Sequence, residues 1–285
     1  MQLKLIQTCF VLFLLSFNVF SQSGWVKEKN EWYINSTLQY AASNNYYNTD
    51  GILITTNTYT SAGLYFYGEL GITDYLTLIS SIPAVKFQKF EGTTTTAGFG
   101  DVLLGGKIGV LKNKFPLSVG IYAEIPSGTS ELFAQVIENP IEQINLPSGD
   151  GEFNLRTEIA LSHSFFPKPF YASVYAGYNF RTMFDNTMFH DQIYNGAEVG
   201  YEFMKKFWLI AKLNTQITLQ DETLSGIDFT RGEGTEFSKY QVSILFPSTT
   251  KWSLSFFYTG YMNFPVTLKN VYAAGNFGLS FSLKK

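Results

Sequence analysis

Gly105, Gly106 and Lys107 bring together the residue types of a phosphate-binding loop. Such a loop needs glycines whose backbone N–H groups cradle phosphate, then a lysine and a Ser or Thr at fixed positions before a helix. Gly105 follows Gly100 at the right interval, but Lys107 comes one position late and Ile108 stands where Ser or Thr is needed. The segment also continues as a strand. We therefore expect neither a nucleotide site nor any other cofactor.

Two histidines could take part in acid–base or nucleophilic chemistry. His163 precedes Ser164, and a lipid hydrolase of the outer membrane would need such a pair at the outer, lipid-facing rim. The pair instead lies beside a tight turn and lacks a nearby Asx partner, so we expect His163 to be an interfacial residue. His190 and Asp191 are expected to give loop polarity rather than a metal site. We therefore predict that the protein is not an enzyme.

The segment Ser148-Gly-Asp-Gly-Glu152 contains two carboxylates, Asp150 and Glu152, that could bind calcium weakly. It lacks the ligand spacing of a calcium-binding loop. A turn with a glycine at positive φ is the expected structure. We predict no metal site.

Charge and cysteine content narrow the class of protein. The 20 basic and 23 acidic residues give a net charge of −3, which argues against a nucleic-acid partner. The single cysteine, Cys9, stands near the start of the chain in an apolar run. The rest of the chain can therefore form no disulfide and no thiolate metal site.

The first 21 residues have the pattern of a signal peptide. Lys4 is followed by an apolar run from Leu5 to Phe20, and the small residues Val19 and Ser21 fit a cleavage site after Ser21. The run is too short for a spanning helix, which needs about 18 or more apolar residues. We expect residues 1–21 to be a signal peptide and residues 22–285 to form one exported domain.

Apolar residues alternate with polar or small ones along most of the remaining chain. From Leu64 to Ile72, for example, the even positions are mostly apolar, and the odd positions include Tyr65, Tyr67 and Glu69. This period of two is typical of strands with two unlike faces. It predicts about twelve strands, near residues 30–42, 58–72, 75–89, 98–112, 116–127, 151–166, 169–183, 189–203, 206–220, 235–247, 250–263 and 268–284.

The connections between these segments alternate between two classes. Tight turns such as Leu111–Pro116 and Phe165–Phe170 alternate with longer polar segments at 43–57, 90–97, 128–150, 184–188 and 221–234, with a short one near 264–267. Short periplasmic turns and longer outer loops are typical of bacterial outer-membrane barrels. The fold prediction is all-β: one transmembrane, antiparallel, up-and-down β-barrel of about 12 strands in the Gram-negative outer membrane.

Aromatic residues gather near both ends of the predicted strands, as in the interfacial girdles of such barrels. The set beside the tight turns is Tyr75, Phe115, Phe165, Phe166, Phe170, Phe203, Phe207, Trp208, Phe246 and Trp252. The set at the loop ends is Tyr59, Phe87, Phe90, Phe99, Phe180, Phe184, Phe237, Tyr261 and Phe264.

Ionisable residues in mid-strand should face the lumen, because Lys or Arg at the lipid midplane costs ~2–4 kcal/mol. Nine lie opposite the apolar row of their strand: Glu69, Lys107, Glu124, Arg156, Glu158, Arg181, Glu198, Glu202 and Lys212. Their mixed signs predict an internal network of paired charges. Such a network either orders water in a pore or fills and braces a narrow barrel.

The last strand carries a further pattern. Asn276 to Leu283 contains a polar residue, a glycine and apolar residues two positions apart. This pattern is similar to the last-strand signal that the outer-membrane barrel-assembly machinery recognises. Lys284 and Lys285 depart from it, because many such chains end on an aromatic residue. We expect this machinery and outer-membrane lipid to be partners.

Short glycine-rich motifs give the chain a resemblance to a known family. The residues "GFGDVLLGGKIGVL" (98–111), "IPSG" (125–128), "LPSGDGEFNL" (146–155) and "YAGYNFR" (175–181) resemble the outer-membrane transporters of the MetA-pathway phenol degradation type. The resemblance implies passage of small aromatic or hydrophobic compounds and no catalytic residues. After the expected cleavage, about ten residues precede the first strand. These are too few for the N-terminal hatch of fatty-acid channels. Loop 128–150 is therefore the expected constriction.

Three functions follow as hypotheses. The first is a passive channel for small, hydrophobic or aromatic solutes. The second is a sealed structural or surface-interaction barrel. The third is an outer-membrane lipid enzyme.

Overall fold

The computed structural model describes residues 22–184, 187–219, 232–248 and 251–285. The expected signal peptide lies outside these residues, as does most of the expected loop at 221–234. Strands are the only regular elements in the described part, and no helix there could cross a membrane.

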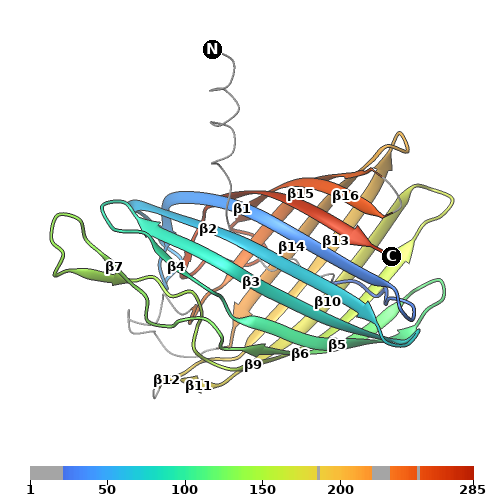
Figure 1. Cartoon of the computed structure of the whole chain (residues 1–285), viewed down its shortest axis with the longest axis horizontal. Coiled ribbons are helices and arrows are strands. Elements are labelled where there is room, and N and C mark those ends of the chain that lie inside the picture. Colours follow the sequence, from blue (N-terminus) through green and yellow to red (C-terminus); the bar gives the residue numbers. More distant parts are fainter. Residues whose placement is uncertain (1–21, 185–186, 220–231, 249–250) are drawn as a thin grey trace, which may run out of the picture.

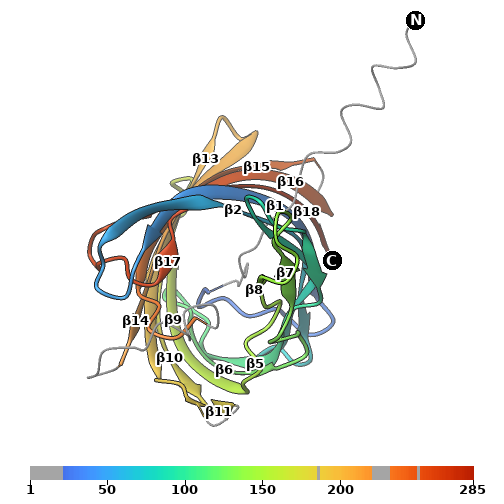
Figure 2. The same ribbon diagram turned by 90° about the vertical axis from the view of Figure 1, so that its left-hand side faces the viewer.

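Twelve long strands form the wall of a closed barrel (Figure 1). They are β1 (Trp32–Tyr47), β2 (Leu53–Gly71), β3 (Leu76–Phe90), β5 (Val102–Leu111), β6 (Leu117–Ile125), β9 (Asn154–Ser164), β10 (Phe170–Arg181), β13 (Gln192–Phe203), β14 (Phe207–Thr218), β15 (Phe237–Pro247), β16 (Trp252–Met262) and β18 (Gly275–Lys284). All are antiparallel to their neighbours, and β1 pairs with both β2 and β18, which closes the ring (Figure 2). The predicted fold is confirmed.

Among the described residues, six short strands lie in the longer connections. They are β4 (Thr96–Gly98), β7 (Phe133–Gln135), β8 (Gln143–Asn145), β11 (Met183–Phe184), β12 (Thr187–Met188) and β17 (Val271–Tyr272). β4 and β17 extend the barrel wall by pairing with β3 and β1, while β7 with β8 and β11 with β12 form small hairpins. We call this end of the barrel the loop end and the end with the tight turns the turn end.

The first predicted loop, 43–57, is wrong in its length. β1 runs to Tyr47 and β2 starts at Leu53, which leaves 48–52 as the connection. The two strands stay paired to their ends, and β17 pairs with Tyr46 and Tyr47 on the other side of β1. The pairing with β17 comes from a distant part of the chain, so the local polarity of 43–57 did not predict it.

The barrel is apolar outside and polar inside. Ile121 and Val242 face outward and are 57% and 51% exposed, while Gln39 and Asn276 face inward and are completely buried. A water-soluble protein has the opposite arrangement. The outer face therefore suits lipid, as in a transmembrane barrel.

Glycines on the inner face let aromatic rings lie directly against the wall. A Cβ added to Gly196 would come within 3.0 Å of the Tyr175 hydroxyl oxygen and of the Leu213 carbonyl oxygen. Gly177 has the same relation to Tyr194. The chain is rich in both glycine and tyrosine, and these contacts give a reason: a glycine on one strand leaves the space that a tyrosine ring of the next strand occupies.

The assignment of aromatic residues to girdles needs correction. Trp208 faces inward, with its ring 5.5 Å from that of Tyr171, and lines a cavity. At the loop end, four members of the expected outer girdle line internal cavities: Tyr59, Phe90, Phe237 and Tyr261. Proximity to a strand end does not decide which face a side chain takes. Strand parity decides it, because successive side chains point to opposite faces.

Candidate functional site: the barrel interior

The N-terminal segment, residues 22–29, lies inside the barrel at the turn end (Figure 2). The Gly24 N–H donates to Ser162 Oγ at 2.8 Å, and the Lys27 N–H donates to Thr77 Oγ1 at 2.8 Å. Ser118 Oγ donates to the Ser23 carbonyl oxygen at 3.1 Å. Because these partners belong to β9, β3 and β6, the segment is fixed to several strands.

The expectation that these residues are too few for an N-terminal hatch did not include an extended segment in the lumen, which is where the structure places them. No globular hatch is needed, since an extended segment of eight residues crosses much of a narrow barrel. The ring of Trp25 packs edge-on against Tyr171, with centroids 5.7 Å apart. Polar side chains along the inner wall supply the hydrogen bonds that an extended backbone requires.

The expected inward charges at the turn end contact this segment. Glu69 is buried, accepts a hydrogen bond from the Tyr67 hydroxyl at 2.5 Å, and lies 3.6 Å from Lys27 Nζ. Lys107 is 1% exposed, and its Nζ donates to the Ser23 carbonyl oxygen at 3.4 Å. Among the described residues, Glu202 forms no ion pair.

Two ion pairs lie farther along the inner wall. Arg156 on β9 donates to Glu124 on β6 at 2.6 Å. Lys212 on β14 lies 2.5 Å from Glu198 on β13. The expected charges thus form separate groups rather than one continuous network.

A third group, the loop-end ion cluster, consists of Arg181, Glu152, Glu233 and His190. Arg181 pairs with Glu152, and its Nη1 lies 3.1 Å from Glu233 Oε2. His190 Nδ1 lies 2.6 Å from the other oxygen of Glu233. The side chains of Arg181, Glu152 and Glu233 are at most 2% exposed. Glu152, His190 and Glu233 belong to three different connections between strands. The cluster therefore holds these three connections together at the loop end.

Burial changes the acidity of carboxyls in the loop-end connections. It raises the pKa of Glu152 to about 7, although Arg181 acts in the opposite direction. Burial likewise raises the pKa of Asp150 to about 6 and raises the pKa of Asp101. These carboxyls therefore take up protons more readily than exposed ones.

The connection between β6 and β9 folds against the inner wall of β3. Gln88 Nε2 donates to the carbonyl oxygens of Leu146 and Pro147 at 3.1 and 2.6 Å. Lys86 Nζ donates to the Ser148 carbonyl oxygen at 2.7 Å. These contacts hold the end of this connection within the mouth of the barrel.

Asp101 holds the same connection at both of its ends. Its carboxylate accepts the Gly128 N–H at 2.8 Å and the Asp150 N–H at 2.7 Å. Gly151 adopts a φ of 84°, as a glycine in a turn can. The described residues contain no group of His, Cys, Asp or Glu side chains that could hold a metal.

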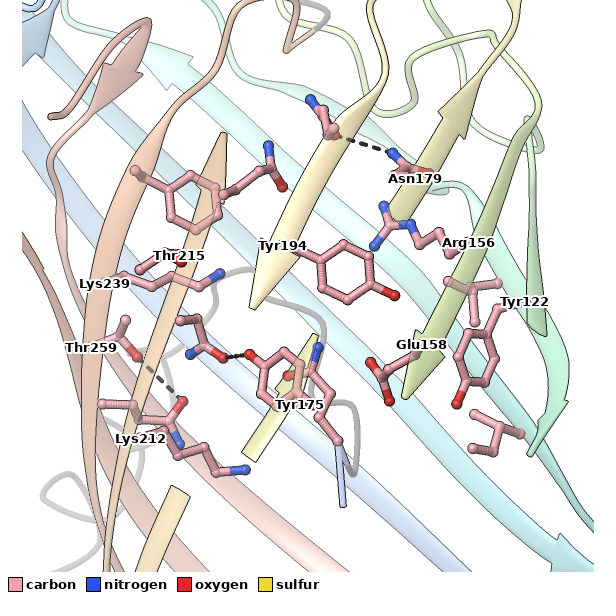
Figure 3. Close-up of a pocket in the computed structure, with 18 residues that line it drawn as sticks. Tyr122, Arg156, Glu158, Tyr175, Asn179, Tyr194, Lys212, Thr215, Lys239 and Thr259 are labelled. Carbon is pink, nitrogen blue, oxygen red and sulfur yellow. Dashed lines mark hydrogen bonds between the residues drawn. The ribbon is translucent and has the colours of Figure 1, made fainter. Parts of the chain in front are cut away.

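Three adjoining cavities run along the interior. The loop-end cavity has a volume of about 440 Å³, the middle one about 270 Å³ and the turn-end one about 660 Å³. Arg156 lines both the loop-end and the middle cavity, and Gln22 and Lys212 line both the middle and the turn-end cavity. Figure 3 shows side chains from opposite walls facing one another across the middle cavity.

Two lysines of the interior were missed by the sequence analysis. Lys239 on β15 lines the middle cavity, and its alternation with Val242 and Ile244 could have revealed it. Lys86 could not be found by counting, because the pairing of β2 with β3 shifts between Leu64 and Tyr65. Such an irregularity exchanges the inner and outer rows of a strand.

The candidate catalytic pair does not assemble. His163 stacks on Phe115, with ring centroids 4.5 Å apart, and its Nδ1 lies 2.6 Å from the Lys114 carbonyl oxygen. Ser164 lines the turn-end cavity on the opposite face of β9. A serine and a histidine on opposite faces of one strand cannot share a proton.

The fold and interior define a twelve-stranded barrel of the outer-membrane type. No protein-family model and no curated protein matches the sequence. Among solved structures, the crystal structure of an outer membrane channel from Pseudomonas putida F1 is similar at a TM-score of 0.65, with 14% identity over 95% of this chain and 100% of that one. The NanC porin is similar at a TM-score of 0.50, with 9% identity over 89% of this chain and 100% of that one. At these identities the likeness concerns the fold.

Proposed function

We propose that the protein is a passive channel of a Gram-negative outer membrane for small hydrophobic or aromatic solutes. The observation that carries this proposal is the row of three cavities with shared walls between the two ends of the barrel. In a barrel that is only structural, side chains could fill this space completely, as they do in small barrels.

Aromatic side chains support the proposed class of solute. Tyr59, Phe90 and Tyr272 pack together beside the loop-end cavity, with ring centroids 5.2 to 5.5 Å apart. Tyr175 and Tyr194 line the middle cavity. The resemblance to the MetA-pathway transporter family points to the same solutes, and the similar Pseudomonas putida structure is itself described as an outer membrane channel.

The remaining assignments belong to the same proposal. Cleavage after Ser21 would release a chain that begins inside the lumen, the tight turns would face the periplasm, and the last strand would be read by the barrel-assembly machinery. Of the nine expected inward charges, those that line the three cavities would border the solute path: Glu69, Glu124, Arg156, Glu158, Glu198 and Lys212. Some of them would act mainly by holding residues 22–29 and the loop-end connections in place.

Single-channel recording tests the proposal. Purified, folded protein in a planar lipid bilayer should give stepwise ion conductance, and the same sample unfolded by heat should give none. No conductance from the folded protein, and no liposome uptake of small solutes, would contradict the channel.

A sealed barrel is the second candidate, favoured by residues 22–29 at one end and 146–150 at the other. A sealed barrel predicts no conductance through the bilayer and no solute uptake under any condition.

A further inference from the structure

Two exposed methionines lie opposite each other in the hairpin of β11 and β12, at the loop end of the barrel (Figure 1). Met183 is 60% exposed and Met188 is 65% exposed, although methionine is among the residue types most often buried. Directly opposed side chains start from Cβ atoms about 4.5–5.5 Å apart and point to the same face. Because methionine is unbranched and flexible, the two sulfur atoms can reach one common ligand.

A histidine lies next to this methionine pair. His190 is two positions after Met188, so their Cα atoms are at most about 7 Å apart. Phe189 between them is 2% exposed, and the Arg181 guanidinium lies 4.7 Å from the centre of its ring. Met188 and His190 flank this buried ring, and the His190 side chain is 39% exposed. Two sulfur atoms and one imidazole are therefore accessible within a short stretch of the loop end.

A buried carboxylate fixes the orientation of the imidazole. His190 Nδ1 lies 2.6 Å from Glu233 Oε1, and the other oxygen of Glu233 accepts from Arg181 at 3.1 Å. Because the carboxylate is the acceptor, Nδ1 carries the proton, and Nε2 of the neutral ring keeps its lone pair for a ligand. Metal-binding histidines almost always donate their other ring N–H in this way. The loop-end ion cluster therefore orients a nitrogen ligand beside the two sulfur atoms.

We propose that Met183, Met188 and His190 form a binding site for a soft monovalent metal ion, Cu(I). Thioether sulfur is a soft ligand that selects Cu(I), and imidazole nitrogen is also a copper ligand. Among the described residues, no metal site can be built from His, Cys, Asp and Glu alone, and the expectation of loop polarity at His190 did not include methionine ligands. None of the three residues lines the three interior cavities, so the site goes beyond the proposed channel and does not depend on it.

Metal binding by the folded, purified protein tests the proposal. Ag(I) is the first probe, because it shares the charge and the ligand preference of Cu(I) and needs no reductant. Calorimetric titration of residues 22–285, which contain no cysteine, with silver nitrate in chloride-free buffer should show one strong site. Mn(II), which prefers oxygen ligands, should bind at least about tenfold more weakly. Anaerobic transfer of Cu(I) from its bicinchoninate complex to the protein then tests Cu(I) itself.

Methyl NMR of labelled methionine identifies the sulfur atoms that bind. Residues 22–285 contain four methionines, which are the proposed pair, Met204 and Met262. Ag(I) should shift the methyl resonances of Met183 and Met188. It should leave the resonance of Met204 unchanged, although that side chain at the turn end is 69% exposed. Shifts of equal size at Met204 would show that any exposed thioether binds silver, and would overturn the site.

Variants separate the three ligands. Met183→Leu, Met188→Leu and His190→Gln should each weaken Ag(I) binding at least about tenfold, while Met204→Leu should leave it unchanged. Heat-modifiable migration on gels shows which variants are folded.

The inference is overturned if a folded protein with both Met183→Leu and Met188→Leu binds Ag(I) like wild type, or if wild type takes no Cu(I) from bicinchoninate. Conductance in bilayers without silver binding would remove the site and leave the channel. Silver binding without conductance would leave the site and remove the channel.

Discussion

At the scale of single residues, buried charge at the loop end has the largest energetic consequences. The Arg181 side chain is 2% exposed and shared by two buried carboxylates, so its removal would take the guanidinium away from both and leave Glu233 with His190. Less deeply buried pairs such as Arg156 with Glu124, whose side chains are 23% and 13% exposed, are partly solvated already. The two arginines therefore form a natural comparison.

Arg181→Ala should lower the free energy of unfolding by about 3–5 kcal/mol, as expected when one partner of a buried ion pair is lost. Arg156→Ala should cost clearly less. Urea titration of both variants in the same detergent, followed by tryptophan fluorescence, measures the difference. Equal losses would show that burial does not set the strength of these pairs.

The raised pKa of Glu152 predicts a pH dependence at the loop end. A carboxyl whose pKa rises on folding binds its proton more tightly in the folded state. Its contribution to stability is complete below the pKa of the unfolded chain, near 4.5, and is lost as pH rises through about 7. Asp150, with a pKa raised to about 6, acts in the same direction.

Hydrogen exchange of residues 146–153, corrected for intrinsic rates, should therefore show more protection at pH 5 than at pH 8. Glu152→Gln resembles the protonated form at every pH and should reduce this difference. If the variant keeps the full wild-type dependence, Glu152 is not the group responsible.

At the scale of elements, glycines on the inner wall position the aromatic rings of neighbouring strands. Gly196→Ala should lower the free energy of unfolding by about 1–3 kcal/mol, because the new methyl group displaces Tyr175 or the backbone of β14. Gly106→Ala on the outer face is the matched control, since its nearest new contact is at 3.5 Å. Urea titration should find the control close to wild type, and a loss of equal size in it would contradict this account.

Asp101 is expected to hold the connection between β6 and β9 in the mouth of the barrel. Asp101→Ala removes two hydrogen bonds from backbone N–H groups to a charged acceptor, each worth ~1.5–3 kcal/mol. A protease specific for glutamate should then cut at Glu138 or Glu142 at least about tenfold faster. Asp50→Ala, on an exposed residue of another connection, should leave the rate unchanged. Equal rates for wild type and Asp101→Ala would exclude this role.

At the scale of the whole molecule, the N-terminal segment occupies part of the lumen at the turn end. Deleting residues 22–29 removes the hydrogen bonds to Thr77 and Ser162 and empties part of the turn end. Because the strands pair only with one another, the ring should still close. Single-channel conductance should rise at least about twofold, since conductance follows the free cross-section of a water-filled lumen. An unchanged conductance would place the limiting constriction elsewhere, in the middle cavity or at residues 146–150.

The sequence by itself determined the architecture and most strand positions. A period of two places side chains on opposite faces, and lipid outside makes charge on the wrong face costly, so the apolar row and the charges opposite it can be read from the chain. The same parity placed Lys107 and Gly106 on opposite faces, as the structure has them. Strand counting worked because each of the twelve strands of the barrel wall is long and is bordered by a turn or a longer connection.

Only the tertiary structure decided what fills the barrel. Segment 22–29 is polar and short, and its contacts lie on β3, β6 and β9, far along the chain. The irregularity between β2 and β3 moved Lys86 into the lumen, and the pairing of Arg181 with Glu152 and Glu233 joins connections that no local pattern relates. Where a strand is regular, local periodicity fixes which face a residue takes. Which residues meet across the lumen depends on the closure of the ring, and closure is a property of the whole chain.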